Sequence, residues 1–216
     1  GRCRYAESQR AGLFYFMVIE HKANEERYAC IAENRINYAY KIAETKQTER
    51  EGQDLSKTGG SMKDGFGRTI EYLRISVTDA CNLRCRYCMP DGVEKLEREA
   101  VLTYEEFLRL AALFAQCGID TVRVTGGEPL VRRGVAELCR MLRGLPGLEE
   151  LCITTNGILL PELAEPLRAA GVDRLNISLD TLRPERYHEI TRVGALSDVL
   201  RGLEAAERAG FQHTKL

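Results

Sequence analysis

The chain has 216 residues, a formal net charge of −1 and 29% charged residues, so its charge balance gives no sign of a nucleic-acid or membrane-surface partner. It is large enough to bury a substantial core, and its longest apolar run, residues 13–19, is far shorter than the ~20 residues of a membrane-spanning helix. Eight cysteines in so long and regular a chain do not indicate a disulfide-stapled secreted domain, and we expect a cytoplasmic protein that binds neither nucleic acid nor membrane.

The first 61 residues share no pattern with the rest of the chain. They are predicted to form an extension of unknown role, with one polar helix over residues 24–49 and a flexible linker over 51–61. Three interpretations stay open: an extension without a role in the chemistry, translated upstream sequence, or a small partner-binding helix. Residues 62–216 are predicted to form the second region. Because residue 1 is not Met and a strand pattern is cut at residue 216, we expect a fragment of a longer protein.

Strand and helix patterns alternate from residue 72 onward. Thr103 and Glu106 form a predicted capping box, so a helix is expected to start there and to end near Gly118. The predicted strands cover residues 73–78, 121–125, 150–154 and 174–178, with a fifth opening at residue 214; later helices cover 135–143, 161–170, 184–191 and 197–209. This alternation predicts an α/β fold with a parallel sheet, either open or rolled into a barrel.

Each predicted strand carries apolar and polar side chains in strict alternation. In the first strand, Leu73 and Ile75 alternate with Arg74 and Ser76. Parallel strands that are buried on both faces read instead as continuous apolar runs. One face of the sheet is therefore expected to lie under the helices, and the other to line a ligand-filled cavity. A partly open barrel with a wet interior fits this pattern.

Three cysteines, Cys81, Cys85 and Cys88, follow the first of these strands at C-x3-C-x2-C spacing. Three thiolates on one loop can hold three irons of a [4Fe–4S] cube and leave the fourth iron open to a small molecule, whereas ferredoxin-type carriers close the cube with a fourth cysteine. A zinc site is the alternative, although no second C-x2-C pair occurs in the chain. Inert buried cysteines are less favoured, since the residues between them are polar.

This loop, with Tyr87 directly before the last cysteine, resembles the cluster loop of radical S-adenosylmethionine (SAM) enzymes. Five segments extend the resemblance: LRISVTD at 73–79, CMP at 88–90, RVTGGEPL at 123–130, TTNG at 154–157 and NISLD at 176–180. Together with the loop they are similar to the GTP 3′,8-cyclase family of molybdenum cofactor biosynthesis, from about residue 65 to residue 216. The resemblance implies a partial TIM-type (β/α) barrel, truncated here after about four βα units.

The resemblance also implies the chemistry. SAM would complete the open iron of the cluster, and one electron would cleave it to methionine and a 5′-deoxyadenosyl radical. That radical would remove the ribose 3′ hydrogen of GTP, and the resulting carbon radical would attack C8 of guanine to give (8S)-3′,8-cyclo-7,8-dihydroguanosine 5′-triphosphate. The cysteines would thus be cluster ligands and catalytic residues at once.

The resemblance places SAM against the turn that follows the second strand. The implied SAM-binding residues are Tyr87, Gly126, Gly127, Glu128 and Ser178. The two glycines lack a Cβ and would let the backbone approach SAM closely. An ordinary tight turn is the alternative for the glycines, and a solvated hydroxyl on the inner wall is the alternative for Ser178.

The predicted inner face also carries cations. Arg74 and Arg123 share the inward parity, and Lys215 has the same parity where the fifth strand opens. Buried cations are costly unless an anion meets them, and the planar fork of arginine suits phosphate oxygens. The resemblance assigns GTP contacts to Arg74, Arg123, Thr154 and Lys215. Internal salt bridges to Asp79, Glu128 or Asp180 are the alternative.

The resemblance implies partners beyond GTP. These are an electron donor for the cluster and a downstream enzyme that forms the cyclic pyranopterin, while a homodimer is left open. The family carries a second [4Fe–4S] cluster, which we expect only beyond residue 216, so the cyclase activity is expected of the full-length enzyme. A peptide-modifying radical SAM maturase and a non-functional fragment remain the alternatives.

Overall fold

The computed structural model describes residues 17–20, 62–63, 66–88 and 101–216. The predicted helix over 24–49 and the predicted linker over 51–61 lie outside the described residues. In the described part of the chain, no helix is both long enough and apolar enough to span a membrane.

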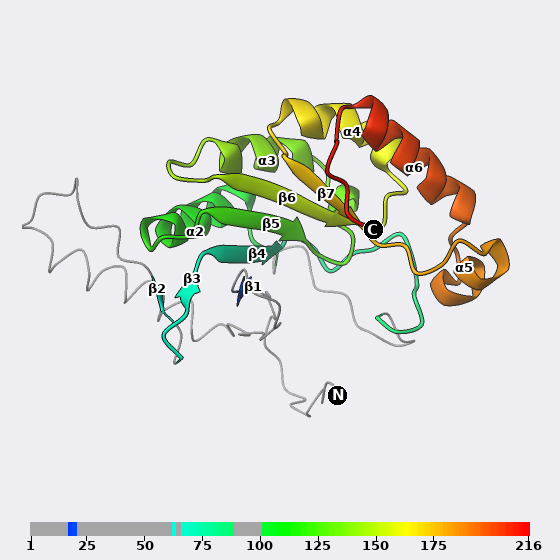
Figure 1. The fold of residues 1–216 in the computed structure, drawn as a ribbon, viewed down its shortest axis with the longest axis horizontal. Coiled ribbons are helices and arrows are strands. Elements are labelled where there is room, and N and C mark those ends of the chain that lie inside the picture. Colours follow the sequence, from blue (N-terminus) through cyan, green and yellow to red (C-terminus); the bar gives the residue numbers. More distant parts are fainter. Residues whose placement is uncertain (1–16, 21–61, 64–65, 89–100) are drawn as a thin grey trace, which may run out of the picture.

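A five-stranded sheet forms the centre of the fold, in the order β1-β4-β5-β6-β7 (Figure 1). Its parallel strands are β4 (Tyr72–Ser76), β5 (Thr121–Thr125), β6 (Glu150–Thr155) and β7 (Arg174–Ile177). Strand β1 (Met17–Glu20) pairs antiparallel with β4 at the edge. The predicted α/β fold with a parallel sheet is confirmed, and β1 was not predicted.

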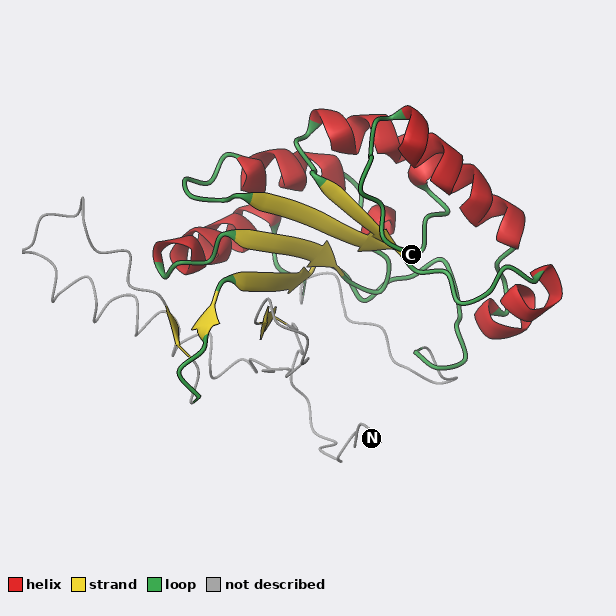
Figure 2. Ribbon diagram, viewed as in Figure 1, coloured by secondary structure: helices red, strands yellow, loops and turns green. Residues whose placement is uncertain are grey.

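Helices cover one face of this sheet (Figure 2). They are α2 (Tyr104–Gln116), α3 (Val135–Arg143), α4 (Leu160–Ala169) and α6 (Leu196–Arg208), while the shorter α5 (Pro184–Thr191) lies beyond the carboxyl ends of the strands. A 3₁₀ turn, η2 (Pro129–Val131), follows β5, and a small hairpin pairs β2 (Met62–Lys63) with β3 (Thr69–Ile70). The predicted ranges of α3, α4, α5 and α6 are confirmed to within one residue at each end.

Helix α2 begins where its sequence predicts. The Thr103 hydroxyl accepts a hydrogen bond from the Glu106 N–H at 3.2 Å, and the Glu106 carboxylate accepts one from the Thr103 N–H at 2.7 Å. These two bonds satisfy donors that no helical carbonyl can reach. Gly118, at φ +94°, follows the helix end in the left-handed conformation that ends many helices.

The two faces of the sheet differ as the alternation predicts. Leu73, Ile75, Val122 and Val124 are almost fully buried, at 1% exposure or less, and pack into the core with the apolar sides of the helices. Their strand neighbours Arg74, Ser76, Arg123 and Thr125 are half-buried on the opposite, concave face. At roughly 25 cal/mol for each Å² of apolar surface removed from water, burying the apolar face is the main force that orients the strands.

The chain begins to add a further parallel strand after α6. Lys215 forms a parallel bridge with Asn176: its N–H donates to the Leu175 carbonyl at 2.9 Å, and its carbonyl accepts from the Ile177 N–H at 2.8 Å. The strand predicted to open at residue 214 is therefore present as a single bridge on the outer edge of β7.

Candidate radical SAM site

The three-cysteine loop leaves the carboxyl end of β4 and passes beside α5 (Figure 1). The Arg84 N–H donates to the Thr191 carbonyl at 3.1 Å, and the Arg86 N–H donates to the Ile190 carbonyl at 3.0 Å. The last carbonyls of a helix have no partner within the helix itself. Helix α5 therefore holds the loop by its own C-terminal end.

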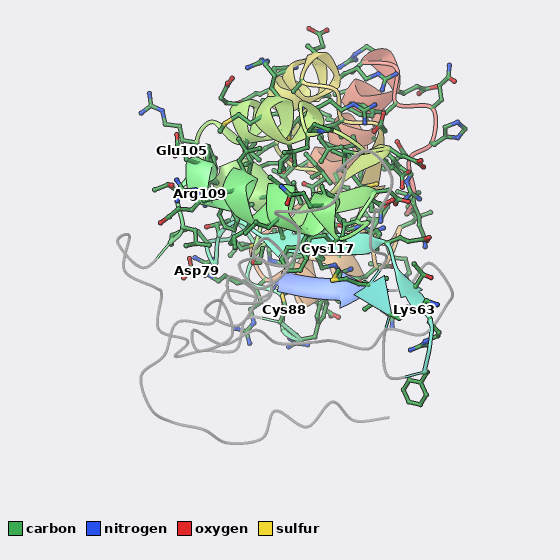
Figure 3. The ribbon with its side chains drawn as sticks, turned by 90° about the vertical axis from the view of Figure 1, so that its left-hand side faces the viewer. Lys63, Asp79, Cys88, Glu105, Arg109 and Cys117 are labelled. Carbon is green, nitrogen blue, oxygen red and sulfur yellow. The ribbon has the colours of Figure 1, made fainter. Side chains whose placement is uncertain are left out.

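The three cysteines of the loop differ in solvent exposure. Cys85 is buried, Cys81 is half-buried and Cys88 is exposed. Cys88 lies on the side of the sheet away from α2, which carries the labelled Glu105 and Arg109 (Figure 3). The pKa of each thiol is raised, first by burial, and in each case the charge of another cysteine of the three adds to the increase. Each of the three thiols is therefore harder to ionise than an ordinary cysteine thiol.

The chemistry of this donor set fits a [4Fe–4S] cluster. Three cysteines come from one loop, and the Leu83 N–H already donates to the Cys81 sulfur at 3.3 Å, a contact that favours a thiolate. Within the described residues, no group of three His, Cys, Asp or Glu side chains is close enough together to hold a metal ion. Cysteine ligands of a cubane bind different irons, so they need not converge on a single point.

Tyr87 ties the loop to the far end of β7. Its hydroxyl donates to the Asp180 carboxylate at 2.9 Å, although the residue as a whole is 66% exposed. Burial of the hydroxyl and this bond to Asp180 raise the pKa of Tyr87. The aromatic residue before the last cysteine thus connects the cysteine loop to the segment that follows β7. The resemblance implies a role in SAM binding for the same residue.

Gly126 and Gly127 pack against the backbone that enters the cysteine loop. A Cβ on Gly127 would lie 2.5 Å from the Ala80 carbonyl oxygen and 2.6 Å from that of Asp79; on Gly126 it would lie 2.7 Å from the Thr78 oxygen. The Gly127 N–H also donates to the Thr78 carbonyl at 2.6 Å. The described residues therefore require glycine here for packing within the protein, a reason that the sequence alone did not reveal.

Glu128 is a buried brace, with 1% of its surface exposed. Its carboxylate accepts from the Leu130 N–H at 3.0 Å, the Thr155 hydroxyl at 2.7 Å and the Asn156 N–H at 2.7 Å. Burial raises the pKa of the Glu128 carboxyl, and these hydrogen bonds lower it in part. Both oxygens are engaged within the protein, so Glu128 joins the turn after β5 to the end of β6.

We expect Glu128→Gln to lower the free energy of unfolding by about 1 kcal/mol. A neutral amide relieves the cost of a buried charge, but its NH₂ group would face the Asn156 N–H, and a buried donor without an acceptor costs about 1–3 kcal/mol. Chemical denaturation of the two chains measures the difference. The exposed Glu137→Gln serves as the control, and equal losses for the two variants would contradict the bracing role.

The concave face carries a row of side chains at equivalent positions of the four parallel strands. Arg74 of β4 is in register with Arg123 of β5, Arg123 with Cys152 of β6, and Cys152 with Arg174 of β7. Neither Arg74 nor Arg123 lies on the helix-covered face. The predicted inward parity of the two arginines therefore agrees with the sheet register.

Arg123 reaches across this concave face. Its guanidinium lies 5.0 Å from the centre of the Tyr72 ring on β4. With the Asn176 amide oriented to suit its hydrogen bonds, the Asn176 oxygen accepts from both terminal nitrogens of Arg123, at 3.1 and 3.2 Å. Among the described residues no ion pair to Arg123 is found, while Glu128 and Asp180 accept hydrogen bonds from other groups.

The other predicted binding residues lie around the same face. The Thr154 hydroxyl is buried and finds no hydrogen-bond partner among the described residues. Lys215 is exposed next to Asn176, and Ser178 is exposed just past β7, where its N–H donates to the Thr155 carbonyl. Thr154 and Asn176 are in register, so the structure brings Thr154, Lys215 and Arg123 to one region of the sheet.

Sequence reasoning did not place Cys152 in the row of concave-face side chains that runs from Arg74 to Arg174. Cys152 is fully buried, as expected of a free cysteine, but it lies on the concave face and not under the helices. Arg174 donates to its sulfur at 3.5 Å and to the Glu150 carboxylate at 3.0 Å, and burial raises the pKa of the Cys152 thiol to about 11. The inward parity shared by Cys152 and Thr154 was the signal that could have found it.

The comparison with protein families covers the cysteine loop and the strands β5, β6 and β7. The model of the radical SAM superfamily matches residues 75–216, which is most of the chain and includes every predicted site residue except Arg74. This chain belongs to the radical SAM superfamily. Radical SAM chemistry uses a [4Fe–4S] cluster and SAM, which agrees with the cluster expected from the three cysteines and with the SAM implied by the resemblance.

Curated relatives of this radical SAM chain include GTP 3′,8-cyclases. It is 50% identical over 162 residues to a GTP 3′,8-cyclase of Pseudomonas putida (strain W619), covering 75% of this chain and 48% of that protein. It is 54% identical over 154 residues to a GTP 3′,8-cyclase of Geobacter sulfurreducens, covering 71% of this chain and 47% of that protein. The chain spans about half the length of the curated relatives it matches.

Solved structures agree with the radical SAM fold. HydG, a maturase of the [FeFe]-hydrogenase, superposes with a TM-score of 0.57 at 16% identity, over 88% of this chain and 40% of HydG. Streptococcus suis SuiB, solved with the precursor peptide SuiA, gives 0.57 at 16% identity, over 89% and 40%. At such low identity these similarities bear on the fold alone, and they support the predicted TIM-type barrel architecture.

Proposed function

We propose that this chain is part of a GTP 3′,8-cyclase, which converts GTP to (8S)-3′,8-cyclo-7,8-dihydroguanosine 5′-triphosphate in the first step of molybdenum cofactor biosynthesis. The observation that carries the proposal is the 54% identity over 154 residues with the GTP 3′,8-cyclase of Geobacter sulfurreducens. An identity this high over 71% of the chain supports a shared reaction as well as a shared fold.

Cys81, Cys85 and Cys88 would hold the cluster in this proposal, and SAM would lie against Tyr87, the Gly126–Glu128 turn and Ser178. When bound, the cluster would pass one electron from its donor to SAM and so supply the radical chemistry that removes the ribose 3′ hydrogen of GTP. The protein contributes position and shelter from water. Here Glu128 and the two glycines fix the turn against the entry of the cysteine loop, at the carboxyl ends of the strands, where barrels of this architecture place their active sites.

Arg74, Arg123, Thr154 and Lys215 would bind GTP on the concave face. Arg74 and Arg123 occupy adjacent register positions and present cationic groups for triphosphate oxygens. The buried Thr154 hydroxyl, which has no partner among the described residues, is available to accept or donate a hydrogen bond. The proposal includes two protein partners, an electron donor for the cluster and a downstream enzyme that forms the cyclic pyranopterin.

The proposal is tested by anaerobic reconstitution with iron and sulfide, applied to this chain and to its full reading frame. SAM cleavage is then measured with and without GTP, together with formation of the cyclised nucleotide. We expect both proteins to retain iron, and the full-length enzyme to make the product. Failure of the full-length protein to retain iron would refute the enzyme assignment; SAM cleavage without any response to GTP would point to another radical SAM reaction.

We expect Arg123→Ala to weaken GTP binding about 10- to 100-fold. A charge-assisted hydrogen bond contributes roughly 1.5–3 kcal/mol, and this side chain is held in place by Tyr72 and Asn176. Equilibrium binding of GTP to the reconstituted full-length enzyme measures the change. Arg140→Ala, which removes an exposed arginine of α3, is the matched control. Unchanged GTP affinity with Arg123→Ala would contradict the assignment.

A further inference from the structure

Asn156, directly after β6, is a buried polar residue that no predicted role included. Only 9% of it is exposed, and its backbone N–H, side-chain NH₂ and side-chain oxygen are all hydrogen-bonded. Its N–H donates to Glu128 at 2.7 Å, its side-chain NH₂ donates to the Asn82 oxygen at 2.7 Å, and its side-chain oxygen accepts from the Ile158 N–H at 3.1 Å. These bonds fix one orientation of the amide.

Asn82 is the other end of this contact, and it lies inside the cysteine loop between Cys81 and Cys85. The bond between Asn82 and Asn156 joins this loop to the segment after β6, and the bond between Tyr87 and Asp180 joins it to the segment after β7. Through Asn156 the loop is connected to Glu128, which also holds the turn after β5. One continuous hydrogen-bonded path thus joins three strand ends.

We propose that Asn156 is a positioning residue for the cluster loop, and that it acts through Asn82. Residues that orient metal ligands without touching the metal tune both its geometry and its properties. The loop must hold three sulfurs at one cube, and SAM must contact the turn at Gly126–Glu128. Since Asn156 is hydrogen-bonded to both the loop and this turn, it fixes the distance between them. The inference rests on the cluster and SAM part of the proposed function and is independent of GTP.

Removing the hydrogen bond between Asn82 and Asn156 should affect only the opening of the cysteine loop. Asn82→Ala and Asn156→Ala both remove the hydrogen bond between the two side chains, and Asn156→Ala also removes the acceptor of the Ile158 N–H, which lies outside the loop. Asn82→Asp keeps the acceptor for the Asn156 amide. The backbone N–H groups of Arg84 and Arg86 remain bonded to α5 in all of these variants, and they report how often the loop opens. Loss of one buried hydrogen bond corresponds to about a fivefold to tenfold change in such an opening.

The first test is amide hydrogen exchange of the full chain without cluster, followed in the peptide that covers residues 82–88. We expect both alanine variants to exchange about fivefold to tenfold faster there, the double variant to match the single ones, and Asn82→Asp to stay within about twofold of the parent. Exchange in α2 and β5 should not change. Unaltered loop exchange, or an increase spread over the whole sheet, would overturn the proposal.

The second test uses the reconstituted enzyme. With iron content equal to that of the parent, the alanine variants should broaden the electron paramagnetic resonance spectrum of the SAM-bound reduced cluster and shift its reduction potential. A spectrum and potential equal to those of the parent would overturn the positioning role. A protein that shows these effects but forms no cyclised GTP would leave this inference standing and refute the proposed reaction instead.

Discussion

Gly127→Ala is expected to reduce the iron retained after anaerobic reconstitution to less than about a tenth of the parent value, because the substitution forces the backbone of the cluster loop to move. The new Cβ would lie 2.5, 2.6 and 2.9 Å from three backbone atoms of Asp79 and Ala80. Backbone atoms cannot rotate away as the end of a flexible side chain can. The two residues that must retreat directly precede Cys81.

The hydrogen bonds at this contact make the displacement worse. The Gly127 N–H donates to the Thr78 carbonyl at 2.6 Å, and the Glu128 N–H donates to the Ala80 carbonyl at 2.8 Å. Separation of the two segments by even a few tenths of an ångström would stretch both bonds and pull on the brace at Glu128. We therefore expect a loss of several kcal/mol in stability as well, shared between steric strain and weakened hydrogen bonds.

The matched control is Gly144→Ala at the end of α3. That glycine has a φ of −72°, and the nearest atom to its added Cβ is the Met141 oxygen at 3.3 Å. A substitution that the backbone accepts without strain changes stability by less than about 1 kcal/mol. Iron, sulfide and thermal unfolding are measured for both variants. Full iron content in Gly127→Ala would show that the turn and the loop do not depend on this packing.

Periodicity predicted the faces of the sheet because one rule governs all four parallel strands. Arg74 and Arg123 face away from the helices since Leu73, Ile75, Val122 and Val124 must be buried. The capping box of α2 was equally predictable, because its two bonding partners are three residues apart. Local and repeating patterns are visible in the chain before it folds.

The network around Asn156 could not be predicted in the same way. Its bond to Glu128 joins residues 28 apart in sequence, and its bond to Asn82 joins residues 74 apart. Such contacts depend on how strand ends meet in space, which no spacing rule encodes. The pairing of β1 with β4 was missed for a similar reason, because an edge strand of four residues leaves no period to detect. The predicted site residues came from sequence motifs, whereas no motif indicated that Asn82 and Asn156 would be bonded to each other.

Gly202→Ala is the second substitution with a large expected effect, and it sets two forces against each other. In an isolated helix, alanine is favoured over glycine by about 1 kcal/mol, so helix propensity alone predicts a more stable α6. In the folded chain, the added Cβ would lie 2.0 Å from the Gly157 oxygen and 2.9 Å from its carbonyl carbon. Both of those atoms belong to the backbone of the turn that follows β6.

The steric effect should dominate. Gly157 has a φ of +82°, so its turn cannot readily change conformation to make room, and overpacking typically costs 1–3 kcal/mol even where side chains can adjust. We expect Gly202→Ala to lose about 3 kcal/mol or more of unfolding free energy, measured by chemical denaturation, with Ser197→Ala on the exposed side of α6 as the control. Because Gly157 directly follows Asn156, a displaced α6 should also loosen the cysteine loop, and faster amide exchange over residues 82–88 in Gly202→Ala would show it. If the Gly202→Ala chain were as stable as the parent, helix propensity would outweigh packing where α6 meets the Gly157 turn. The close contact between α6 and this turn would then not limit stability.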